Sequence, residues 1–378
     1  MKKFVFKLAA AECVLVCVML FYSGSLLFAQ SSQSAKNNAL FEAAKSGTVT
    51  DVKDALKNGA DVSAMNESGY TVLMWAARYT ANPDVIKALI AAGADVNERE
   101  DKSGMTALIC SALNNANAEV TKALLDAGAD VNAECDLGIT PLIYAILGQG
   151  KTEVIKALLD AGADVNAKVM LGMTPLMVAT EKGENANAEV IKVLLAAGAD
   201  VNTKCLGYTA LMNAAEKNAN AEVIKVLLAA GADVNAKGKD GCTALMCAAC
   251  YNENAEVTKA LLDAGADVKA RDKDGFTALM CAARYNANAE VTKALVDAGA
   301  DVNARKEDGG TAAAALMYAA FNNKNPDVVK VLIEAGANKY ARDEDGNRAI
   351  DLLESRKYIK DEFYGTDAYW KMRDLLLY

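Results

Sequence analysis

Cysteine and the acidic residues are the side chains of this sequence whose types could support chemistry. Cys247 and Cys250 form a Cys-x-x-Cys pair, and Cys242 lies five residues before Cys247. A redox pair would need a thiol at the start of a helix, and a zinc site would need a second pair of ligands. The sequence offers neither feature. We therefore interpret these cysteines as packing residues and expect no metal and no cofactor.

The acidic residues argue against catalysis because one aspartate recurs at the same position of a repeated unit, whereas a catalytic carboxylate pair would occur once. The chain also has no histidine, the commonest general base. We find no glycine-rich phosphate loop, nucleophile elbow or kinase signature. The sequence therefore predicts that the protein is not an enzyme. The repeated aspartates are Asp95, Asp130, Asp164, Asp200, Asp233, Asp267 and Asp301.

The repeated unit extends along nearly the whole chain. An Ala-Gly glycine marks each copy, and successive copies are 33 to 37 residues apart. A period in this range indicates a stacked solenoid. An asparagine before Ala-Glu-Val predicts the N-cap of a helix in several copies. The marking glycines are Gly59, Gly93, Gly128, Gly162, Gly198, Gly231, Gly265, Gly299 and Gly336.

Each copy contains Gly-x-Thr, then Leu-x-x-Ala-Ala, Val-x-Lys-x-Leu-Leu and Gly-Ala-Asp-Val-Asn, with small variations. By these motifs the chain resembles the ankyrin-repeat family over about nine-tenths of its length. The resemblance implies an all-α repeat solenoid of about ten stacked repeats, each a pair of antiparallel helices with a β-hairpin finger, and capping repeats at both ends. The family's Thr-Pro-Leu-His histidine is replaced here, mostly by methionine. We expect methionine packing to replace the hydrogen bonds that the histidine would make between repeats.

The amino-terminal residues predict a targeting segment. Lys2, Lys3 and Lys7 precede the apolar run Cys13–Phe28, and Ala29 offers a small residue for cleavage. The run has about 16 residues, fewer than the roughly 20 that span a bilayer. We therefore predict export to the periplasm, the cell surface or the medium, with an uncleaved membrane anchor as the alternative.

The predicted domain organisation follows from the targeting segment and the repeats. The sequence predicts a signal peptide at 1–29, a polar linker at 30–36 and an ankyrin-repeat domain at 37–378, comprising an amino-terminal cap repeat at 37–67, internal repeats at 68–343 and a carboxyl-terminal cap repeat at 344–378.

Composition limits the class of partner. The formal net charge is −9 at pH 7, which argues against a non-specific nucleic-acid binder, since phosphate contacts need clustered Lys and Arg. We interpret the acidic balance as a contribution to solubility rather than as a site for a basic partner.

The first candidate binding surface is an apolar strip at the finger tips of three consecutive middle repeats. Most other repeats place aspartate just before Gly-x-Thr, whereas these place Leu137, Leu171 and Leu206. An exposed apolar strip rimmed by charge marks an interaction site, and the alternative is that the fingers pack on one another. The other predicted members are Ile139, Leu147, Val169, Met170, Met173 and Tyr208.

The second candidate surface lies at the ends of the first helices and combines tyrosine with arginine. Both residue types are enriched at the energetic centres of protein interfaces, and the alternative is a solvated edge. Its predicted members are Arg78, Tyr79, Tyr251, Arg284 and Tyr285.

Taken together, these features predict an exported, non-catalytic, monomeric scaffold. It would bind an unidentified protein partner through its finger tips and inner helix face. A secreted effector that binds host proteins and a membrane-tethered structural scaffold are the alternatives. We expect contact with a membrane only if the amino-terminal segment is uncleaved.

Overall fold

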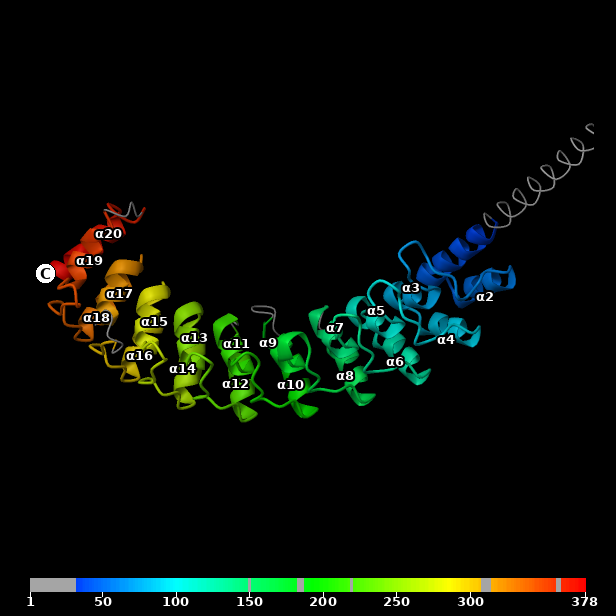
Figure 1. The fold of residues 1–378 in the computed structure, drawn as a ribbon, viewed down its shortest axis with the longest axis horizontal. Helices are drawn as coiled ribbons and strands as arrows, with labels where there is room; N and C mark the ends of the chain where they lie inside the picture. The colour runs from blue at the N-terminus through cyan, green and yellow to red at the C-terminus, as the bar shows by residue number, and fades with distance from the viewer. Residues whose placement is uncertain (1–31, 149–150, 182–186, 218–219, 307–313, 358–361) are drawn as a thin grey trace, which may run out of the picture. The chain divides into compact units, whose positions relative to one another are not determined.

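The computed structural model of this chain describes residues 32–148, 151–181, 187–217, 220–306, 314–357 and 362–378. The predicted signal peptide at 1–29 lies outside these residues. Contacts divide the chain after Ala163 into two compact units. Each unit is a stack of helix pairs, as expected for an all-α solenoid (Figure 1). No helix in the described part of the chain combines the length and the apolar character needed to cross a bilayer.

The first unit begins with a helix over residues 32–46. The predicted polar linker at 30–36 is therefore wrong for residues 32–36. This first turn of helix is held by Gln33, whose Nε2 donates to Gly59 O at 3.0 Å. The following helices are α2 (Val49–Lys57), α3 (Val72–Tyr79), α4 (Pro83–Ala91), α5 (Ala107–Asn114), α6 (Ala118–Asp126), α7 (Pro141–Leu147) and α8 (Thr152–Asp160).

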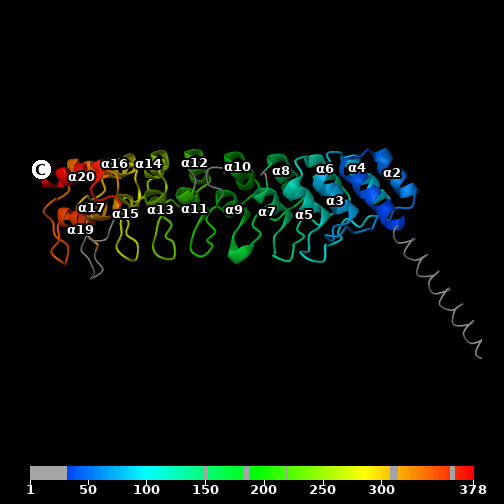
Figure 2. The same ribbon diagram turned by 90° about the horizontal axis from the view of Figure 1, so that it is seen from above.

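The second unit repeats the same pattern of short paired helices. The odd-numbered helices from α9 to α19 pack in one row and the even-numbered ones from α10 to α20 in another, and fingers project from one side of the stack (Figure 2). The elements are η1 (Met170–Gly172), α9 (Pro175–Glu181), α10 (Ala188–Ala196), α11 (Ala210–Lys217), α12 (Ala221–Ala229), α13 (Ala244–Tyr251), α14 (Ala255–Asp263), α15 (Ala278–Tyr285), α16 (Ala289–Asp297), α17 (Ala315–Asn322), α18 (Pro326–Glu334), α19 (Ala349–Ser355) and α20 (Asp367–Leu377).

Local side chains fix where these helices start and stop. In α13 the Thr243 hydroxyl accepts from the Met246 amide, and in α14 the Asn254 side chain accepts from the Glu256 amide. Each cap satisfies an amide that has no partner inside its helix. The following Gly265 has a φ of 86°, a left-handed conformation that ends the second helix. The asparagine caps predicted from Ala-Glu-Val are confirmed at Asn117, Asn187, Asn220, Asn254 and Asn288.

The core consists of small residues on the first helices and bulky residues around them. Ala248 and Ala249 are fully buried, which allows neighbouring first helices to approach closely, and Leu261 fills the space beside the second helix. The methionines at the family's histidine position are buried as expected: Met74, Met177, Met212, Met246, Met280 and Met317.

Methionine packing is accompanied by a set of hydrogen bonds that the sequence did not lead us to expect. Buried Asn286 follows α15, and its Nδ2 donates to Ala249 O at 3.2 Å and Asn252 O at 2.9 Å in the preceding repeat. Its Oδ1 accepts from the Asn288 amide at 2.9 Å. Asn323 makes the same bonds one repeat later. Asparagine therefore supplies the polar contact at these two junctions, and Arg356 supplies it at the next, where Nη1 donates to Asn323 O at 2.7 Å.

A second asparagine, in the Asp-Val-Asn motif, joins successive second helices. Asn235 Nδ2 donates to Gly265 O at 3.1 Å, and Asn235 Oδ1 accepts from the Asp267 amide at 2.8 Å. Lys269 occupies the equivalent position of the next repeat. A lysine side chain has no acceptor for the following Asp301 amide. The same paired contact is made by Asn97, Asn166, Asn202 and Asn303.

Replacing Lys269 with asparagine should complete this row of contacts. Two added hydrogen bonds, each worth about 0.5–1.5 kcal/mol, should raise the free energy of unfolding by about 1–3 kcal/mol. The Asp301 amide should also exchange with deuterium more slowly, which reports on the repeat directly. The reverse change, Asn235→Lys, is the matched control and should destabilise by a similar amount. An unchanged Asp301 exchange rate in Lys269→Asn would contradict the assignment.

Candidate protein-binding surface

The fingers are short hairpins rather than strands. Within the described residues they form isolated bridges only, joining Met65 with Thr71, Val169 with Met173 and Cys205 with Tyr208. The β-hairpin fingers predicted from the family resemblance are therefore present in a reduced form. Each tip is a tight turn whose backbone conformation limits which residue fits there.

The finger of residues 205–208 is closed most tightly. The Cys205 amide donates to Tyr208 O at 2.9 Å and the Tyr208 amide donates to Cys205 O at 2.8 Å. The two residues between them, Leu206 and Gly207, have φ values of 50° and 92°. A two-residue turn with both φ values positive is type I′, for which Asn-Gly is the favoured sequence. Leucine at its first position is therefore strained.

Leu171 shares this feature, with a φ of 66° followed by Gly172 at 95°. In the part of the chain that the structure describes, Leu171 and Leu206 are the two non-glycine residues with positive φ. A left-handed conformation costs an L-residue about 1–2 kcal/mol. Strain of this kind gathers at functional sites.

Both leucines also extend into solvent. Leu171 is 81% exposed and Leu206 is 66% exposed. Their fingers lie side by side, because Cys205 Sγ donates to Leu171 O at 3.2 Å. Half-buried Met173 and 37%-exposed Tyr208 come from the same two fingers. We refer to Leu171 and Leu206 as the leucine tips.

The predicted strip needs correction at two positions. Ile139 and Val169 are only 5% and 4% exposed. Their backbones pair within their fingers, Ile139 O with the Cys135 amide and the Val169 amide with Met173 O, and their side chains are buried below the tips. The Met170 side chain lies outside what the structure describes. Leu137 and Leu147, in the first unit, are exposed as predicted.

The tyrosine and arginine candidates form two separate groups. In the second unit, the Tyr251 and Tyr285 rings stack with centroids 6.4 Å apart, and the Arg284 guanidinium lies 4.9 Å from the Tyr285 ring. In the first unit, Arg78 lies 5.3 Å from the Tyr79 ring. Tyr79 also packs on Trp75, its centroid 4.7 Å from that of the indole.

Arg284 has two further aromatic neighbours that the sequence analysis missed. Its guanidinium lies 5.8 Å from the Phe276 ring and 5.6 Å from the Tyr318 ring. Phe276 occupies the same Gly-x-Thr position as Tyr208. That shared position could have marked Phe276 as a candidate from the sequence. Tyr318 comes from the next repeat, and the sequence did not indicate its contact with Arg284.

Within the described residues the cysteines are free thiols, and Cys242 and Cys250 are only half-buried although the sequence predicted packing residues. Cys247 and Cys281 are buried, and Cys242 Sγ lies 3.7 Å from Cys247 Sγ. The hydrogen bond from Cys247 lowers the pKa of Cys242. Burial raises the pKa of Cys110 to about 12. Within the described residues, no three or more His, Cys, Asp or Glu side chains are grouped so that they could hold a metal ion.

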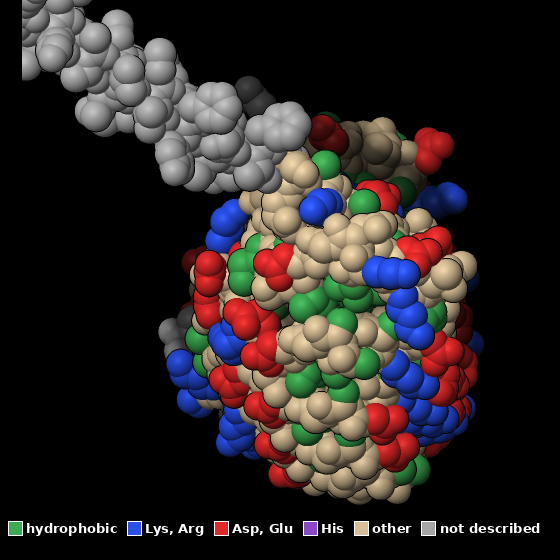
Figure 3. Space-filling view, turned by 90° about the vertical axis from the view of Figure 1, so that its right-hand side faces the viewer, with side chains coloured by type: hydrophobic (Ala, Val, Ile, Leu, Met, Phe, Trp, Pro, Cys, Tyr) green, Lys and Arg blue, Asp and Glu red, His purple; other side chains and the backbone are tan. Residues whose placement is uncertain are grey.

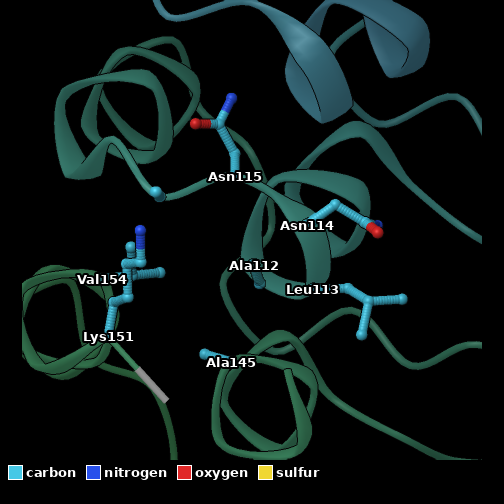
Figure 4. Close-up of a pocket in the computed structure, with 8 residues that line it drawn as sticks. Ala112, Leu113, Asn114, Asn115, Ala145, Lys151 and Val154 are labelled. Carbon is cyan, nitrogen blue, oxygen red and sulfur yellow. The ribbon is translucent and has the colours of Figure 1, made fainter. Parts of the chain in front are cut away.

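A small hollow beside α5 in the first unit is structural. Figure 4 shows Ala112, Ala145 and Val154 around it, with the Asn115 side chain pointing away. Its volume of about 10 Å³ is roughly that of one water molecule. The Asn115 amide nitrogen is already used, donating to Ala77 O at 2.9 Å and Thr80 O at 2.7 Å. This hollow is too small to hold a ligand.

The charged surface is mixed in sign. On the face in Figure 3, lysine and arginine side chains alternate with aspartate and glutamate, and the hydrophobic side chains form small groups between them. Such a face has no continuous basic area for a nucleic-acid backbone, which agrees with the acidic composition.

Comparison with known proteins identifies the family of the repeats that carry these surfaces. A family profile described as ankyrin repeats (3 copies) matches residues 8–100, 81–169, 168–238, 211–306 and 249–343. The chain belongs to the ankyrin-repeat family. Ankyrin repeats bind protein partners, so this family membership supports a protein-binding scaffold.

Two curated relatives share a short part of this ankyrin-repeat chain. Mitochondrial disaggregase from Bos taurus is 46% identical over 70 residues, which is 18% of this chain and 10% of the relative. The Homo sapiens protein of the same name is 44% identical over 70 residues. The similarity covers about a tenth of the length of these relatives.

The cysteine pKa shifts predict unequal reactivity toward iodoacetamide at pH 8. Cys110, with a pKa of about 12, should hold only about one thiolate in ten thousand at that pH. Half-buried Cys242, whose pKa is lowered, should react at least about tenfold faster, since the thiolate is the nucleophile. Peptide mass spectrometry measures both rates. Unfolding in urea is the control and should equalise them, and equal rates in the folded protein would contradict the assignment.

Proposed function

We propose that this ankyrin-repeat protein is an exported, non-catalytic scaffold that binds a partner protein through the leucine tips. The observation that carries the proposal is the combination of strain and exposure at Leu171 and Leu206. Each leucine costs free energy in its turn and leaves its apolar side chain in water. Its side chain therefore does not stabilise the fold of the free protein. Contact with a partner gives that side chain a role.

The energetics favour an external contact over packing between fingers. The leucine tips remain 81% and 66% exposed although their fingers are adjacent. Burying a leucine side chain is worth roughly 1.5–3 kcal/mol. The two leucine side chains supply the apolar centre of a small binding surface, and Met173 and Tyr208 from the same fingers enlarge that surface.

Rigid presentation lowers the cost of binding. The 205–208 finger is closed by two backbone hydrogen bonds and is tied to the 171 finger through Cys205 Sγ. Lys204 Nζ donates to Lys237 O of the following finger at 3.0 Å. Because these tips are already ordered, little conformational entropy is lost when a partner binds.

Export is proposed on the amino-terminal sequence, with its lysines, apolar run and small residue at position 29. A secreted effector and a membrane-tethered scaffold would use the same binding chemistry. They differ in the fate of residues 1–29, which mass spectrometry of the native amino terminus distinguishes.

The double variant Leu171→Asn with Leu206→Asn tests the binding surface without damaging the fold. Asparagine tolerates the left-handed conformation at both positions and gives the favoured Asn-Gly turn at 206, so the free energy of unfolding should rise by about 1 kcal/mol. Cross-linking and affinity capture from the native envelope should lose the wild-type partner by more than about tenfold, a loss equivalent to about 1.4 kcal/mol.

The matched control changes a finger of the same unit that carries aspartate at this position. Asp240→Asn should leave capture and melting as in the wild type. Wild-type capture by the double variant would show that the leucine tips are not the binding site.

A further inference from the structure

An open hollow in the second unit offers a site of a different character. It encloses about 490 Å³ and lies against α15, α17 and neighbouring fingers. Phe276, Tyr318 and Phe321 form its apolar wall, and Arg284 and Lys306 bring positive charge to it. None of these residues belongs to the fingers of the leucine tips.

The aromatic rings fix the position of the Arg284 side chain. The guanidinium lies between 4.9 and 5.8 Å from the rings of Phe276, Tyr285 and Tyr318. The Phe276 and Tyr318 rings themselves pack with centroids 5.2 Å apart. A guanidinium held by aromatic faces keeps its N–H edges in fixed directions, which suits a carboxylate that accepts two parallel hydrogen bonds.

Within the described residues, Arg284 differs from Arg271 of the same unit in its hydrogen bonds. Arg271 Nη1 donates to Gly275 O at 2.9 Å and to Arg305 O at 2.8 Å, joining adjacent fingers. Arg284 Nε is buried, and no acceptor among the described residues lies within hydrogen-bonding distance of it. A buried donor without a partner costs about 1–3 kcal/mol. Arg284 is therefore not used as Arg271 is, to join adjacent fingers through backbone carbonyls.

The charges around the hollow restrict the ligand further. Lys306 Nζ lies 5.1 Å from the Phe276 ring, so a second cation faces the aromatic wall. Asp274 and Asp343 also line the hollow. The Asp343 carboxylate is used in its own turn, where Oδ1 accepts from the Asn347 amide at 2.7 Å. The cations over the aromatic wall attract a negative charge on a ligand. The two carboxylates nearby would repel a ligand that carries several negative charges, so the hollow suits a ligand with a single one.

We propose that this hollow binds a partner segment in which a single carboxylate side chain stands next to a bulky apolar side chain. The carboxylate would meet Arg284, and the apolar group would pack on Phe276 and 37%-exposed Phe321. The inference rests on the proposed function in assuming a protein partner. It uses residues separate from the leucine tips, so the two can be tested independently.

Fluorescence polarisation of labelled peptides on the full chain tests this specificity. The probes are eight-residue peptides of glycine and serine that contain Phe-Glu, Phe-Gln, Ala-Glu or Phe-phosphoserine at the centre. The Phe-Glu peptide should bind, and the other three should bind at least about tenfold more weakly. Equal binding of Phe-Gln, or no binding of Phe-Glu at millimolar protein, would overturn the proposal. Tighter binding of the phosphoserine peptide would overturn the choice of a carboxylate and indicate that the hollow prefers a phosphate.

Variants assign the site. Arg284→Gln should weaken Phe-Glu binding at least tenfold, and Arg284→Lys, which keeps the charge but not the paired donors, should weaken it less. Arg78→Gln is the matched control, because Arg78 occupies the same position of α3 and its Nε is also buried without a partner. It should bind as the wild type does, and an equal loss would overturn the assignment.

Two further measurements keep the outcomes separate. Circular dichroism confirms that each variant is folded. The double variant Leu171→Asn with Leu206→Asn should retain Phe-Glu binding while it loses the partner. Loss of the peptide in that variant would contradict a separate site in the hollow, whereas retained partner capture would contradict only the proposed function.

Discussion

The hydrogen bond from an asparagine side chain to the backbone of the neighbouring repeat is the contact on which each unit depends. A helix pair of this size cannot bury its apolar side alone, so its stability comes from the repeat beside it. Asn286 and Asn323 are buried and satisfy carbonyls at the ends of preceding first helices. Because a buried polar group is costly without its partners, these bonds also fix the register of one repeat on the next.

Because these bonds fix the stacking of the repeats, the residues at the finger tips can differ from one repeat to the next. The tips need a backbone that turns back sharply, and Gly207 with a φ of 92° meets most of that need. The residue before the glycine faces solvent and contributes little to the stack. Leucine at this place raises the free energy of the isolated protein, which is why we connect the leucine tips with binding.

The two proposed contact regions differ in physical character. The leucine tips offer apolar area on a rigid turn, whereas the hollow around Arg284 offers a cation held by aromatic rings. Apolar burial supplies affinity with little directional preference. Charge-assisted hydrogen bonds supply geometric specificity. A scaffold that carries both can combine affinity with selection of its partner.

The sequence by itself determined the repeat, the helices and their caps, because these depend on residues a few positions apart, as with Asn254 and the Glu256 amide. Only the tertiary structure decided which side chains meet across repeats. It decided the burial of Ile139 and Val169. It also decided the Asn286 bonds and the grouping of Arg284 with Tyr318, which bring together residues that are distant in sequence. Periodicity cannot give these contacts, since they depend on how one repeat sits on the next.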